Sequence, residues 1–161
     1  MSERVLCVLH NIKSAKAFGT PDAYNMAVTN YRCIFAKFTA DILKQASAEA
    51  NAQGQAEGKG FFERWADQLT ATLFFGNRYL GWPGEAVLAE CPGNFAIEFT
   101  NIHRVTFREK RRYQEPGQII VRIYGEVTFD TTFGKYTYQL DNMPVDDIAA
   151  MRGVMGNLVQ G

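Results

Sequence analysis

The chain lacks a net charge, a long apolar run and a cysteine pattern, and each absence removes a class of function. Its 17 Lys and Arg residues are balanced by 17 Asp and Glu residues, so no global charge points to nucleic acid or to a membrane surface. No segment approaches the roughly 20 apolar residues of a spanning helix. The N-terminal apolar run is too short for a signal peptide.

Cysteine is scarce and odd in number. Cys7, Cys33 and Cys91 lie far apart, which fits neither a disulfide framework nor a zinc site. We therefore expect buried free thiols, a cytoplasmic location, and neither a metal nor another cofactor.

Catalytic motifs are also missing. His10 ends an apolar strand, His103 stands beside Arg104, and neither lies near a Ser or Cys in a nucleophile motif. The stretch "GQAEGKGFF" (54–62) lacks the final residue and the preceding strand of a phosphate-binding loop. The adjacent acids Asp146 and Asp147 are explained by capping of a helix. We expect no enzyme activity.

What is present is enough for one domain with a substantial core, since the chain has 161 residues and 47% hydrophobic content. The pattern predicts strands over 4–10, a hairpin over 24–37 that turns at Thr29-Asn30, and strands over 95–99 and 102–113. Two or three further strands follow over 119–140, with turns near 114–118 and 133–134. Helices are predicted over 38–53 and 61–75, as a short segment from Pro83, and after Pro144, where Ile148, Met151, Met155 and Leu158 share a face. This order predicts an α+β fold.

Three segments resemble the bacterial and archaeal branch of the pleckstrin-homology-like (PH-like) superfamily, which includes the GRAM domains. They are "MAVTNYRCIFA" (26–36), "FAIEFTNIHRVTF" (95–107), and "FGKYTYQLDN" (133–142) with the helix "DDIAAMRGVM" (146–155). The resemblance implies an antiparallel β-roll or barrel of about seven strands with a C-terminal capping helix. Residues from about 38 to 92 would be a helical insertion in this single domain, 1–161. Members of the superfamily bind lipids, peptides or each other, so the resemblance implies a scaffold more than an activity.

A basic hairpin is the first candidate site. Strand alternation places Val105 and Phe107 on one face, and Arg104, Thr106 and Arg108 on the other. The possible anion- or lipid-binding residues are Arg104, Arg108, Lys110, Arg111, Arg112 and Arg122. A solvated face with Glu109 and Glu115 as ion-pair partners is the interpretation we favour, and a phosphate-bearing head group is the alternative. Nucleic acid is disfavoured, although Tyr113 and Tyr124 could stack on bases.

An aromatic helix is the second candidate. Its large apolar residues are Phe61, Phe62, Trp65, Leu69, Leu73, Phe74 and Phe75. Packing on the Ala-rich segment 38–53 explains much of this face, and an interfacial membrane helix is a further alternative. Some of the side chains fall outside a single stripe, so we predict a homo-oligomer whose interface includes this helix. The sequence thus favours a non-enzymatic binding or assembly module that self-associates or binds protein. Binding of anionic lipid or a membrane surface through 104–112 is the alternative.

Overall fold

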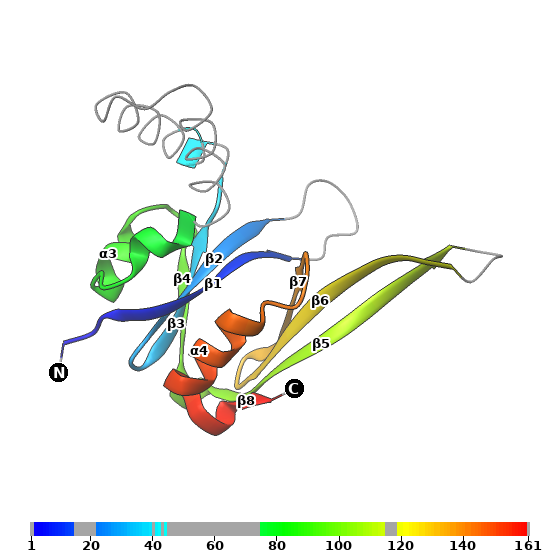
Figure 1. The fold of residues 1–161 in the computed structure, drawn as a ribbon. Coiled ribbons are helices and arrows are strands. Elements are labelled where there is room, and N and C mark those ends of the chain that lie inside the picture. Colours follow the sequence, from blue (N-terminus) through cyan, green and yellow to red (C-terminus); the bar gives the residue numbers. More distant parts are fainter. Residues whose placement is uncertain are drawn as a thin grey trace.

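The computed structural model describes residues 2–14, 22–39, 41, 42, 44, 75–114 and 119–160, without the side chains of residues 75, 112–114 and 119–122. The elements follow in the order β1 (Val5–Ser14), β2 (Ala23–Thr29), β3 (Arg32–Lys37), η1 (Phe75–Tyr79), α3 (Gly84–Ala89), β4 (Phe95–Glu98), η2 (Phe99–Asn101), β5 (Ile102–Gln114), β6 (Ile119–Thr131), β7 (Gly134–Leu140), α4 (Val145–Met155), η3 (Gly156–Leu158) and β8 (Val159–Gln160). Figure 1 shows the strands as one twisted sheet, with α4 and α3 lying against different parts of it and the β5–β6 hairpin projecting beyond it.

The sheet has two halves joined at a narrow junction. Its eight strands run in the order β4-β3-β2-β1-β7-β6-β5-β8, and neighbours are antiparallel except that β8 is parallel to β5. Between the halves, β1 meets β7 only at Lys13↔Gln139 and Ser14↔Tyr138. We call this junction the seam, β1–β4 the N-terminal half and β5–β8 the C-terminal half. The remainder of β1 beyond the seam packs against α4.

One hydrophobic core lies between the sheet and α4. Phe35 is at its centre, stacked on Phe95 with ring centroids 4.6 Å apart and packed edge-on against Phe129 at 5.3 Å. From α4, Ile148, Met151 and Met155 enter this core. The core joins residues from both halves of the sheet, so it holds the halves together where backbone pairing at the seam is sparse.

A second core covers the opposite face of the N-terminal half. It contains the buried residues Val5, Val8, Ala27, Ile34, Ala36, Tyr79 and Val87. Tyr79 comes from η1 and Val87 from α3, so the segment 75–89 forms the cover. The Tyr79 hydroxyl donates a hydrogen bond to Glu90, which also pairs with Arg78 at 3.0 Å. Burial and this hydrogen bond raise the pKa of Tyr79 well above its ordinary value, so the phenol stays neutral.

An ionic network, of which the Arg32–Glu3 pair is nearly buried and Glu85 is exposed, connects the N-terminus to this cover. Arg32 donates from Nε and Nη2 to the Glu3 carboxylate at 2.6 and 2.8 Å, and Nη2 also contacts Glu85 of α3 at 2.8 Å. The Thr29 hydroxyl donates to Glu3 at 3.0 Å. Burial alone would raise the pKa of Glu3, but the hydrogen bonds from Arg32 and Thr29 outweigh it and hold the pKa below its ordinary value.

Most of the expected elements are present, and the α+β class is confirmed. The 24–37 hairpin is β2 and β3, but its turn falls at Asn30-Tyr31 rather than at Thr29-Asn30, and Asn30 does not take the positive φ that asparagine tolerates in tight turns. Instead, the Thr29 hydroxyl accepts hydrogen bonds from the backbone N–H groups of Tyr31 and Arg32 at 3.2 and 3.0 Å. The short helix after Pro83 and the helix after Pro144 are confirmed as α3 and α4.

Several details differ from the expectation. The sheet has eight strands rather than about seven, because the two residues of β8 pair with β5. β1 continues to Ser14, beyond the expected end at residue 10. The residues after His10 are mostly polar, so the sequence pattern did not indicate this part of the strand. α4 ends at Met155, where Gly156 takes a φ of 61°, so Leu158 falls in η3 instead. Of the helix expected over 38–53, residues 41, 42 and 44 are helical. The helix expected over 61–75 lies outside the described residues, except that Phe75 begins η1.

Candidate functional site

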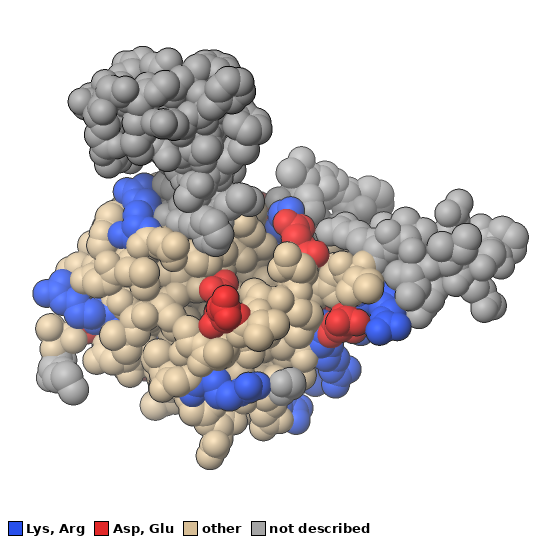
Figure 2. Space-filling view, in the orientation of Figure 1, with Lys and Arg blue, Asp and Glu red and all other residues tan. Residues whose placement is uncertain are grey.

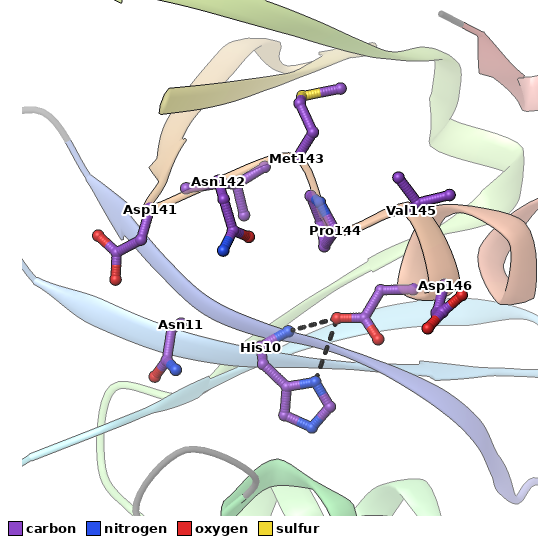
Figure 3. A pocket seen from close by; sticks show the side chains of 10 residues that line it. His10, Asn11, Asp141, Asn142, Met143, Pro144, Val145 and Asp146 are labelled. Carbon is purple, nitrogen blue, oxygen red and sulfur yellow. Dashed lines mark hydrogen bonds and ion pairs between the residues drawn. The ribbon is translucent and has the colours of Figure 1, made fainter. Parts of the chain in front are cut away.

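A cavity of about 520 Å³ opens beside the seam (Figure 3). Its lining comes from the middle of β1, the end of β7, the loop that joins β7 to α4, and the first turn of α4. The lining residues are His10, Asn11, Leu140, Asp141, Asn142, Met143, Pro144, Val145, Asp146 and Asp147. We call it the seam cavity. Its volume lies within the range of about 300–1,000 Å³ that is usual for ligand sites.

An irregularity in β1 shapes one wall of the cavity. Leu9 pairs with Met26 and Ile12 with Tyr24, so two residues of β1 face the single residue Asn25 of β2. Asn11 takes a φ of 54°, which asparagine tolerates better than most side chains, and its backbone N–H donates to the Asn25 side chain at 3.1 Å. The bulge places both His10 and Asn11 in the lining of the seam cavity.

His10 connects three elements at the cavity. Its Nδ1 lies 3.2 Å from Asp147 Oδ2 on α4, and its backbone N–H donates to the same oxygen at 3.4 Å (Figure 3). Its Nε2 lies 3.1 Å from Asn77 Oδ1 on η1. Gly76 permits this approach, because a Cβ there would stand 2.6 Å from Val8 and 3.0 Å from the His10 ring. Both ring nitrogens are therefore engaged within the protein.

The opposite wall is the loop over residues 141–144. Gly125 of β6 lets this loop lie close to the sheet, since a Cβ there would stand 2.9 Å from the Asn142 carbonyl oxygen. Asp141 pairs with Lys13 at 3.4 Å, but both side chains are about half exposed, at 60% and 45%. Figure 3 shows Asp141 and Asp146 at opposite ends of the loop, with Asn142 between them. Carboxylates therefore flank the cavity on both sides.

A thiol lies beside this site, and its protonated form is favoured. Cys7 lies on β1 near Asp147, and burial, with the Asp147 charge as a smaller cause, raises the pKa of its thiol to about 11. The protonated thiol is a poor nucleophile. Within the described ranges, no group of three or more His, Cys, Asp and Glu side chains is placed to hold a metal ion. The arrangement can offer hydrogen bonds, negative charge and apolar surface to a ligand.

Sequence reasoning missed this constellation. We explained Asp147 by helix capping, but α4 has Pro144 at its N-cap position and no side-chain capping bond, and Asp147 instead receives hydrogen bonds from His10. His10 and Asp147 are 137 positions apart and His10 and Asn77 are 67 apart, so no local spacing signals the contact. His103, the other histidine, is exposed on β5 and does not line the cavity.

The basic hairpin has the predicted strand alternation. Val105 and Phe107 are buried, whereas Arg104 and Arg108 are exposed. A second, smaller cavity of about 290 Å³ lies on this outer face of β5, β6 and β7. Its lining is Arg104, Thr106, Arg108, Glu126, Thr128, Asp130, Lys135 and Thr137, and we call it the outer groove.

Acidic neighbours offset much of the hairpin's charge. Ion pairs join Arg104 to Asp130 at 3.8 Å, Lys110 to Glu126 at 3.9 Å, and Arg111 to Glu109 at 3.3 Å. Arg111 alternates with Lys110 along β5, so the candidate cations are divided between two faces. Figure 2 likewise shows Lys and Arg side chains dispersed around the visible face, with acidic side chains near the N-terminal end of α4. The side chains of Arg112 and Arg122 are outside the described set.

The predicted interface residues Phe61, Phe62, Trp65, Leu69, Leu73, Phe74 and Phe75 are outside the described residues or, for Phe75, described only in the backbone. None of the protein families, curated proteins or solved structures with which the chain was compared matches it. No helix among the described residues is long and apolar enough to cross a membrane.

Proposed function

We propose that the chain is a non-enzymatic binding or assembly module of PH-like fold, and that it recognises a protein partner at the seam cavity. The observation that carries this proposal is a cavity of about 520 Å³ whose walls are fixed by contacts between β1, α4 and η1. Its one histidine has both ring nitrogens engaged and the nearby thiol is kept protonated, so the walls are suited to holding a ligand rather than to transforming it.

The strand order supports the PH-like part of the proposal. Strands β1 to β4 are consecutive neighbours, as are β5 to β7, and a helix follows the last of them and packs on the core. The same order of meandering strands and closing helix is what the sequence resemblance implies. The eighth strand and the segment between β3 and β4 are additions to that plan.

A peptide-display selection on the whole chain tests the binding proposal. Selected peptides should shift the backbone amide resonances of Asn11, Asn142 and Val145, which line the seam cavity. Val145 is 72% exposed at its mouth, so Val145→Glu should abolish the binding. The matched control is Phe133→Glu, which changes another exposed apolar residue (66%) in the β6–β7 turn and should leave binding intact. Selected peptides that shift only amides elsewhere would overturn the choice of site.

Light scattering tests the assembly part. The predicted homo-oligomer uses Phe61–Phe75, and the mass should rise with concentration and fall when Trp65 and Leu69 are changed to Ser. If the protein is a monomer at every concentration, the assembly role is wrong and only the peptide-binding role remains.

Binding of anionic lipid is the second candidate, and the outer groove favours it. Arg108 and Lys135 line that groove without an ion pair within 4 Å among the described residues, and Arg104 has only a long contact with Asp130 at 3.8 Å. Co-sedimentation with phosphatidylserine vesicles at two salt concentrations tests this role. Loss of binding in Arg104→Glu/Arg108→Glu would assign it to the groove, and loss in Arg111→Glu/Arg112→Glu would assign it to the hairpin tip. No sedimentation at low salt would remove this candidate.

A further inference from the structure

We infer that the seam cavity takes the side chain of a lysine or arginine presented by a peptide segment of the partner. This inference rests on the proposed function and adds the chemistry of the ligand. The cavity combines two features in its lining, a set of carboxylates and an apolar surface, and a long basic side chain has the matching pair of features.

The charge of the cavity favours a cation. Asp141, Asp146 and Asp147 line it, and no lysine or arginine does. Asp147 is engaged by His10 and Asp141 by Lys13, whereas Asp146 makes no ion pair within 4 Å among the described residues. The N-terminus of α4 contributes about half a positive charge. That is too little to offset Asp146, so a negative charge remains for the ligand.

The apolar part of the lining favours cations that carry an apolar stem. Leu140, Met143, Pro144 and Val145 contribute apolar surface between the carboxylates, and Val145 is 72% exposed. Lysine and arginine carry an apolar stem ahead of the charged group, so the stem can cover Met143 and Val145 while the charge reaches Asp146. A purely apolar ligand would bury carboxylates without a partner, which is costly.

The amides of the lining suit a peptide rather than a free amine. Asn11 and Asn142 present both donors and acceptors at the cavity, and a peptide backbone beside the inserted side chain offers the complementary groups. A free diamine such as putrescine has a second charge in place of those groups.

The experiment is an NMR titration of the whole chain with short acetylated, amidated peptides of sequence GSXSG. X is lysine, arginine, or one of their neutral counterparts, norleucine and citrulline. The lysine and arginine peptides should shift the amides of Asn11, Asn142 and Val145 and bind about tenfold more tightly than the neutral peptides. Their affinity should fall about fivefold in Asp146→Asn, the size expected for one partly exposed ion pair.

Asp130→Asn is the matched control, because it removes a carboxylate from the outer groove and should leave the titration unchanged. Asp146 is exposed, so its variant should keep the wild-type spectrum and unfolding midpoint. Neutral peptides that bind as tightly as the basic ones would overturn the inference and leave the proposed function standing. Putrescine that binds as tightly as the lysine peptide would overturn the assignment to a peptide. If display-selected peptides bind only elsewhere on the protein, the proposed site fails together with the inference.

Discussion

The two halves of the sheet are built from the same kind of strand but are covered differently. In β2 and β3, almost every residue is buried, because α4 lies on one face and the segment 75–89 on the other. In β6, from Gly125 to Thr131, buried and partly exposed residues alternate, because only one face meets the core. Coverage, rather than strand type, therefore decides where substitutions should be costly. The seam cavity lies where the two kinds of coverage meet.

The largest expected effect is in the doubly covered half. Phe35→Ala removes a fully buried ring packed against Phe95, Phe129 and Tyr138, and should lower the free energy of unfolding by about 3–5 kcal/mol. Urea denaturation measures this change. Phe133→Ala is the same substitution at a side chain 66% exposed in the C-terminal half, and should cost less than about 0.5 kcal/mol. Equal losses would contradict the burial given to Phe35 and the exposure given to Phe133.

The ionic network of the N-terminal half should add a pH dependence. Because the pKa of Glu3 is lower in the folded chain, its stabilising contribution is complete above about pH 4.5, the ordinary value, and is lost as the pH falls through the folded pKa. Glu3→Gln should lower the free energy of unfolding by about 2–3 kcal/mol at pH 7. Denaturation at several pH values should show this difference shrinking below about pH 4.5. A difference that is constant down to pH 2 would contradict the role given to Glu3.

The close contact between η1 and β1 can be tested by a substitution that adds one methyl group at Gly76. Gly76→Ala would place a Cβ 2.6 Å from Val8 and 3.0 Å from His10, and should destabilise the protein by about 1–3 kcal/mol. Gly153→Ala is the matched control on α4, where an added Cβ meets nothing within 4 Å, and it should stabilise by about 0.5–1 kcal/mol. Thermal unfolding of both variants gives the comparison. Destabilisation of similar size in both would indicate that crowding beside His10 is not the cause.

The smallest effect is expected on the outer face of the C-terminal half. Asp130→Asn breaks a 3.8 Å ion pair with Arg104, in which the side chains are 30% and 50% exposed. The free energy of unfolding should change by less than about 0.5 kcal/mol. Denaturation in 0.05 and 0.5 M NaCl checks this. A loss above 1 kcal/mol would mean that the face is covered by something in solution, for example by a second copy of the chain.

Local sequence was a good guide to elements and a poor guide to the site. The strand alternation of Val105 and Phe107 against Arg104 and Arg108 was predictable because side chains on a strand alternate between faces. The buried face of α4 followed from helical spacing in the same way. The turn residues were less predictable, since Thr29 rather than the φ of Asn30 organises the β2–β3 turn. The seam cavity was missed entirely.

By itself, the sequence determined the order of β1 to β7, α3 and α4, the α+β class and the faces that enter the core, because these depend on periodicities of two to four residues. Only the tertiary structure decided that β1 and β7 separate beyond Lys13 and Ser14, and that α4 begins beside the bulge at His10 and Asn11. It also decided that Arg104 and Lys110 pair with Asp130 and Glu126 of the neighbouring strand β6, whereas the pair of Arg111 with Glu109 was expected from the sequence. The physical reason is that a contact between residues 137 positions apart is fixed by how complete elements pack, and packing leaves no periodic trace in the chain.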